Sequence, residues 1–147
     1  MDTVKNFKSS GIAFINDKSV IIDHICDNFL DAGGTVTFCS KNIQDGLTQL
    51  STVQETPEVC IIDLDFYEED VLAQLQELKT SYPELKLIAH SDIDTEKTIT
   101  SLLAIGIDGY LLLGSDPEDF RNAITSVLNN KKYFSAGVAK IAQEYFK

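Results

Sequence analysis

Acidic side chains follow two apolar runs of this sequence, at positions where a strand would end. Asn16 and Asp17 come directly after the run GIAFI. Asp63 follows the run VCII, and Asp65 lies two residues further on. In a parallel sheet, the carboxyl ends of neighbouring strands meet at one edge, where ligands bind. Carboxylate and carbonyl oxygens suit Mg²⁺, which takes one or two protein carboxylates and keeps several waters. The pattern indicates a magnesium site, with helix caps or plain loop residues as the alternative interpretation.

The elements that must position these residues alternate between short β-branched runs and longer amphipathic patterns. Five runs predict strands, over 11–15, 35–39, 59–62, 85–89 and 109–113. Helical spacing follows them over 20–29, 44–50, 70–81, 95–105 and 116–128, with a last helical pattern over 136–146. Because nearly all-apolar strands are buried on both faces, we expect an α/β fold. It is a flavodoxin-like, doubly wound, five-stranded parallel sheet with helices on both faces and a C-terminal tail helix.

Length and composition narrow the function classes. The 147 residues suit one domain, and 12 Lys+Arg against 23 Asp+Glu give a net charge of −11, which argues against direct binding to nucleic acid or an anionic membrane. Cys26, Cys39 and Cys60 form no CxxC motif, so we expect three small buried apolar residues rather than disulfides or a zinc site. No apolar run has the length of a signal peptide or membrane span, so we expect a cytoplasmic chain.

The joint spacing of the strand ends is more specific than any single motif. Asp17 and Asp63 are 46 residues apart, Asp63 and Ser91 are 28 apart, and Ser91 and Leu113 are 22 apart. With the segments PEVCIIDLD and GIDGYLLL, and with Pro-Glu-Asp at the next helix start, this spacing resembles the receiver domain of two-component response regulators. The resemblance is to the NarL/LuxR type and covers roughly residues 11–134.

The resemblance implies a role for each strand-end residue. Asp63 matches the aspartate that accepts a phosphoryl group from a histidine kinase, and Asp17 with the backbone carbonyl of Asp65 matches the Mg²⁺ ligands. Ser91 matches the hydroxyl that binds a phosphoryl oxygen and pulls its loop inward. Tyr110 matches the aromatic switch residue, which turns inward once that loop has moved. Such an acyl phosphate needs a metal and hydrogen-bond donors around its oxygens.

The sequence also departs from the family pattern. Leu113 stands where the family has a lysine that pairs with the phosphoryl group, and Asn16 replaces the first acid of the usual pair. Asp92 follows Ser91 where a small residue normally leaves room. Losing a cation while crowding acids disfavours a dianionic phosphoryl group. We therefore predict an atypical receiver that is weakly phosphorylated or not phosphorylated.

The predicted function is non-catalytic signalling by protein–protein contact, as the regulatory half of a transcription regulator. Its partners would be a histidine kinase or another signalling protein, and a second copy of the chain through the stripe on the last helix. No membrane partner is expected, and DNA would be bound only through an attached domain that this chain does not contain. Residues 1–10 would form a polar extension, 11–134 the receiver-like domain, and 135–147 the tail helix or linker towards that attached domain.

Three alternatives stay open. In the first, Asp63 is a working phosphoacceptor with Mg²⁺, and Lys18 replaces the lost cation. In the second, Asp17, Asp63 and Asp65 serve a flavodoxin-like metal-dependent hydrolase. In the third, the chain is a scaffold whose acidic pocket has no role. His90, beside Ser91, is a candidate neighbour of the phosphoryl group, although a packed core histidine is the favoured interpretation.

Overall fold

The computed structural model describes residues 11–15, 34–64, 70–112 and 116–147. Six strands form one parallel sheet in the order β2-β1-β3-β4-β5-β6. They are β1 (Gly11–Ile15), β2 (Thr35–Ser40), β3 (Val59–Asp63), β4 (Lys86–Ser91), β5 (Gly109–Leu112) and β6 (Tyr133–Phe134). The described helices are α2 (Ile43–Leu50), α3 (Val71–Ser81), α4 (Glu96–Ile105), α5 (Pro117–Leu128) and α6 (Ala136–Tyr145). The helix predicted over 20–29 lies outside the described residues.

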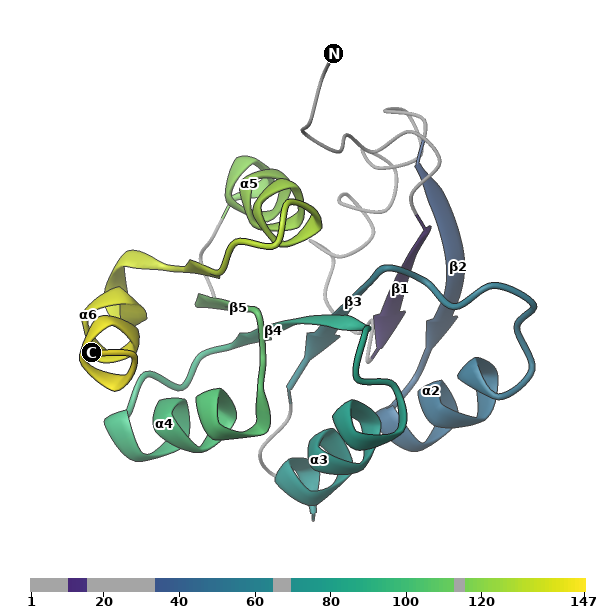
Figure 1. Cartoon of the computed structure of the whole chain (residues 1–147), viewed down its shortest axis with the longest axis horizontal. Coiled ribbons are helices and arrows are strands. Elements are labelled where there is room, and N and C mark those ends of the chain that lie inside the picture. The colour runs from purple at the N-terminus through teal and green to yellow at the C-terminus, as the bar shows by residue number, and fades with distance from the viewer. Residues whose placement is uncertain (1–10, 16–33, 65–69, 113–115) are drawn as a thin grey trace.

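The sheet is doubly wound, as predicted. Figure 1 shows α2, α3 and α4 on one face, α5 on the opposite face, and α6 beside α4. The chain order reverses between β1 and β3, which makes their carboxyl ends the switch point where ligands bind in such sheets. The sheet has one strand more than expected, because Tyr133 and Phe134 pair with Gly109 and Tyr110. A two-residue strand is too short to give a periodic signal in the sequence.

Two apolar clusters fill the space on either side of the sheet. Successive strand residues alternate between them, because side chains point to opposite faces with a period of two. Residues Ala13, Cys60, Ile62, Leu87, Ala89 and Tyr110 lie in the cluster that includes buried residues of α2, α3, α4 and α6. Residues Ile12, Phe14, Ile61, Ile88 and Leu111 lie in the cluster that includes α5. The same alternation determines to which face of the sheet each side chain at the carboxyl edge points.

The ends of α4 and α5 follow from local sequence. Asp116 caps α5, and its side chain accepts from the N–H of Asp119 while the Asp119 side chain accepts from the N–H of Asp116. Pro117 occupies the first turn, where a missing N–H costs nothing. Gly106 ends α4 with φ of 107°, a left-handed conformation that glycine adopts without strain. These helix boundaries confirm the sequence prediction.

The cysteines only partly match their predicted environment. Cys60 is fully buried in the centre of the sheet, as expected. Cys39 is exposed, and the expectation that it is buried is wrong. Its strand β2 lies at the edge of the sheet, so its side chains are less covered than those of β3. Cys26 lies outside the described residues. None of the described helices is long and apolar enough to cross a membrane.

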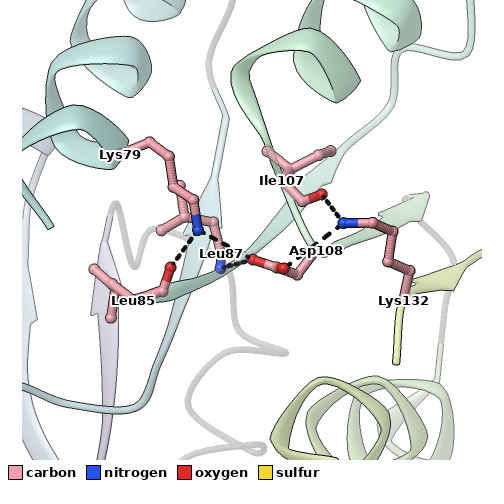
Figure 2. Close-up of polar contacts among 6 residues, drawn as sticks. All are labelled: Lys79, Leu85, Leu87, Ile107, Asp108 and Lys132. Carbon is pink, nitrogen blue, oxygen red and sulfur yellow. Dashed lines mark hydrogen bonds and ion pairs between the residues drawn. The ribbon is translucent and has the colours of Figure 1, made fainter. Parts of the chain in front are cut away.

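A polar cluster at the amino end of β5 ties distant segments together (Figure 2). The Asp108 carboxylate accepts from the Leu87 N–H at 2.9 Å, and its oxygens lie 3.6 Å from Lys79 Nζ and 3.8 Å from Lys132 Nζ. Lys79 donates to the Leu85 carbonyl at 2.8 Å. One aspartate therefore joins α3, the start of β4 and the segment before β6, far from the carboxyl edge of the sheet.

Candidate functional site at the carboxyl edge of the sheet

Two pairs of side chains lie near the carboxyl ends of β3 and β4, and one of them includes Tyr110, the second residue of β5. Asp63 and His90 are partners in the register of β3 and β4, and Ser91 follows His90. By the alternation along the strands, Asp63 and His90 belong to the face that α5 covers. Ser91 and Tyr110 belong to the face that α3 and α4 cover. Asp63, Ser91 and Tyr110 therefore lie towards the same edge of the sheet. Asp63 is on the face that α5 covers, whereas Ser91 and Tyr110 are on the opposite face.

His90 lies beside Asp63, on the neighbouring strand and on the face of the sheet that α5 covers. Its Nδ1 is 3.7 Å from Asp63 Oδ1, and its side chain is 1% exposed, whereas the Asp63 side chain is 20% exposed. The imidazole meets the ring of Phe120 edge-on, with 5.1 Å between centroids. Burial lowers the pKa of His90 below its usual value. The ring is therefore neutral near pH 7, and its contact with the carboxylate is not an ion pair under those conditions.

Ser91 and Tyr110 are joined through the loop after β4. Ser91 Oγ accepts from the N–H of Ile93 at 3.2 Å, and the Tyr110 hydroxyl donates to the Ile93 carbonyl at 2.6 Å. Both residues are buried, and no part of Tyr110 is exposed. Burial raises the pKa of Tyr110, and the charges of Asp92 and Asp94 raise it further, while a hydrogen bond with the Ser91 side chain opposes them. The phenol is therefore protonated near pH 7 and serves as a donor.

Several predicted site residues lie outside the described part of the chain. They are Asn16, Asp17, Asp65 and Leu113, together with Lys18. Asp92 is described and exposed, on the loop directly after Ser91. An exposed acidic side chain therefore lies next to Ser91, whose hydroxyl is the predicted phosphoryl ligand. The roles assigned to all these residues stay predictions.

The predicted magnesium site can be compared with this structure only in part. The described residues include one of its three ligands, Asp63, and they contain no group of three His, Cys, Asp or Glu side chains that could hold a metal. A partly exposed carboxylate at the switch point fits a cation that keeps most of its water. Any full ligand set would need Asp17 and Asp65, so Mg²⁺ stays a prediction.

The buried, packed ring of His90 fits the favoured interpretation of a core histidine, whereas sequence reasoning missed the loop contact at Ile93. The sequence signals a buried polar residue at His90, since that residue lies in a strand that is covered on both faces. The Ile93 contact has no such signal, because both of its bonds use backbone atoms, which every residue carries.

No protein-family model matches the sequence. Two curated proteins are related to it in sequence. The transcriptional regulatory protein DesR of Bacillus subtilis is 32% identical over 79 residues, which cover 54% of this chain and 39% of DesR. The transcriptional regulatory protein DegU of Brevibacillus brevis is 26% identical over 104 residues, which cover 69% of this chain and 44% of DegU. The chain thus spans less than half the length of the curated relatives it matches.

Solved structures share the fold at low sequence identity. The isolated REC domain of RcsB from Salmonella enterica serovar Typhimurium, in the presence of the phosphomimetic BeF3⁻, superposes with a TM-score of 0.76 and 16% identity, covering 90% of this chain and 97% of that one. A LuxR-family two-component response regulator from Aurantimonas sp. gives a TM-score of 0.79 and 15% identity, covering 95% of this chain and all of that one.

The chain therefore has the fold of a response-regulator receiver domain. Within that class, its structural neighbours include LuxR-family regulators, and its sequence relatives are transcriptional regulatory proteins. The resemblance to receivers of the NarL/LuxR type, predicted from the spacing of strand ends, is confirmed.

Proposed function

We propose that this receiver domain signals by protein–protein contact and that its switch is held inward by the chain's own residues, without need of a phosphoryl group. The observation that carries this proposal is the position of Tyr110. The resemblance implies that this residue turns inward after the loop beside it moves. Here its hydroxyl donates to Ile93 in that loop, and its ring lies fully in the core.

Further contacts of the described residues support this proposal. Ser91 Oγ accepts from the Ile93 N–H, so the loop after β4 is tied back to the end of that strand. The ring of Tyr110 lies in the cluster that also contains Val138 of α6. Two departures from the receiver pattern support the same proposal. The resemblance puts Asp92 where a receiver has a small residue and Leu113 where it has a lysine, and both changes disfavour a dianion at Asp63.

Intact-protein mass spectrometry after incubation with Mg²⁺ and a small phosphodonor tests the proposal, together with NMR of 3-fluorotyrosine at Tyr110. We expect little or no mass gain and the same Tyr110 signal with and without the donor. The signal should also be unchanged in Asp63→Asn and in the matched control Glu77→Gln, which alters an exposed acid on α3. A full phosphoryl mass gain that Asp63→Asn abolishes, with a shifted Tyr110 signal, would overturn it.

A second candidate is a receiver in which Asp63 is phosphorylated by a histidine kinase. The partial exposure of Asp63 at the switch point favours this candidate, because the phosphoryl donor must reach the carboxylate. Asp17, Asp63 and the carbonyl of Asp65 would hold Mg²⁺, which would neutralise phosphoryl oxygens. Leu113→Lys should then raise the yield or lifetime of the acyl phosphate. The same mass measurement decides between the two candidates.

The wider function is proposed from the relatives. DesR and DegU are transcriptional regulatory proteins, so this domain would be the regulatory part of such a protein, with residues 135–147 leading towards a separate DNA-binding domain. Receiver domains are generally signalling domains rather than enzymes. A metal-dependent hydrolase is the rival, and turnover of generic phosphoesters that is lost in Asp63→Ala would support that rival instead.

A further inference from the structure

His90 is a buried polar side chain at the end of β4. Within the described part of the chain, neither of its ring nitrogens has a hydrogen-bond partner, and the side chain is 1% exposed. Phe120 of α5 contacts the ring edge-on and offers no acceptor. A buried polar group without a partner is costly, so a histidine here needs a compensating interaction.

Among the described residues, the carboxylate of Asp63 is a charged group that faces the ring, and its Oδ1 lies 3.7 Å from Nδ1. A neutral imidazole carries one N–H, on either Nδ1 or Nε2. With the hydrogen on Nδ1, the positive end of the N–H dipole faces the carboxylate. With the hydrogen on Nε2, the lone pair of Nδ1 faces the same negative charge. Electrostatics in this buried position therefore favour the first tautomer.

We propose that His90, with its hydrogen on Nδ1, is a positioning residue that holds the Asp63 carboxylate from inside the sheet. In this arrangement the Nδ1 hydrogen faces Oδ1 of the carboxylate across 3.7 Å and attracts it electrostatically. The inference rests on Asp63 being the site residue of the proposed function, in either of its two candidate forms.

The tautomer is measured directly by long-range ¹H–¹⁵N NMR of the labelled chain. His24 and His90 are the two histidines, so His24→Gln assigns the signals. We expect a protonated Nδ1 and an unprotonated Nε2 in His90, and a loss of this preference in Asp63→Ala. Glu77→Ala, which removes an exposed acid from α3, serves as the control and should preserve it. A proton on Nε2 in the parent chain would overturn the proposal.

The positioning role is measured by the side-chain rotamers of Asp63, from three-bond couplings. His90→Asn keeps an N–H donor and should keep one dominant Asp63 rotamer, whereas His90→Leu keeps the volume and should let the carboxylate average among staggered rotamers. A single rotamer in folded His90→Leu would also overturn the proposal. If that variant does not fold, the tautomer of the parent chain decides. Neither measurement uses phosphorylation, so the inference and the proposed function can fail separately.

Discussion

Ser135 binds the backbone of Tyr110. Its N–H donates to the Tyr110 carbonyl at 2.9 Å, and its Oγ accepts from the N–H of Leu112 at 3.0 Å, so it holds β5 on both sides of Leu111. Ser135 is also the N-cap of α6, and its side chain makes no cap hydrogen bond there. The residue that positions α6 therefore contacts the backbone of the candidate switch residue.

Ser135→Ala should loosen α6 from β5. The Leu112 N–H would lose its acceptor, and we expect the free energy of unfolding to fall by about 1 kcal/mol. Amide hydrogen exchange in α6 should rise with it, because α6 opens more readily. Ser135→Thr keeps the hydroxyl and should stay close to the parent. Ser81→Ala, at the exposed end of α3, is the control, and equal exchange in the two alanine variants would contradict this relationship.

Tyr110→Phe should make the chain less sensitive to alkali. Burial raises the pKa of Tyr110 above its usual 10.0, so above pH 10 the unfolded chain releases a proton that the folded chain keeps. The stability that comes from the protonated Tyr110 is fully present below pH 10. It is lost as the pH rises towards the raised pKa of Tyr110 in the folded chain. Urea unfolding at about pH 8 and about pH 10.5 measures that loss.

The phenylalanine variant should lose about 1 kcal/mol at the lower pH, where the bond to Ile93 is missing. Between the two pH values, the free energy of unfolding should fall less in this variant than in the parent. The pKa of Tyr133 is also raised, so part of the fall in stability at high pH should remain in both chains. Tyr145→Phe alters an exposed phenol on α6 and should reproduce the parent's pH dependence. The same loss in Tyr110→Phe and the parent would show that Tyr110 is not the titrating group.

Local signals predicted most of the fold. Apolar runs located the strands, and Asp116-Pro117 located the start of α5, because both depend on neighbours in sequence. Placing Asp63 and Ser91 at one edge needed only the parallel order of the strands. The contact between His90 and Asp63 depends on the register of β3 against β4, which the sequence does not specify on its own. Ser135 and Asp108 were missed because their partners come from distant segments.

Cys60 and Cys39 should differ strongly in reactivity towards a thiol reagent. Burial raises the pKa of the Cys60 thiol, so the reactive thiolate is suppressed, and the reagent cannot reach it without opening of the sheet. Cys39 is exposed on the edge strand. We expect Cys60 to react roughly a thousandfold or more slowly in the native chain, and both to react in urea. Peptide mass spectrometry after timed labelling gives the two rates, and comparable native rates would contradict the buried position.

Asp108→Ala should destabilise the chain more than removal of an ordinary surface acid. The Asp108 carboxyl, 13% exposed, is the acceptor for the Leu87 N–H and lies between Lys79 and Lys132 (Figure 2). Leaving a buried donor unpaired costs about 1–3 kcal/mol, and urea unfolding should show a loss of that size. Asp108→Asn keeps an acceptor oxygen without the charge, so it should lose less.

Glu77→Ala is the matched control for this change, since it removes an exposed acid from α3 and should leave stability within about 0.5 kcal/mol of the parent. Raised salt separates the two contributions of Asp108. Screening weakens the attraction to the partly exposed Lys132 but leaves the hydrogen bond to Leu87 in place. The difference between Asp108→Asn and the parent should therefore shrink in salt, while the cost of Asp108→Ala should largely persist. A cost of Asp108→Ala that disappears in salt would show that charge, and not the backbone acceptor, is what this residue contributes.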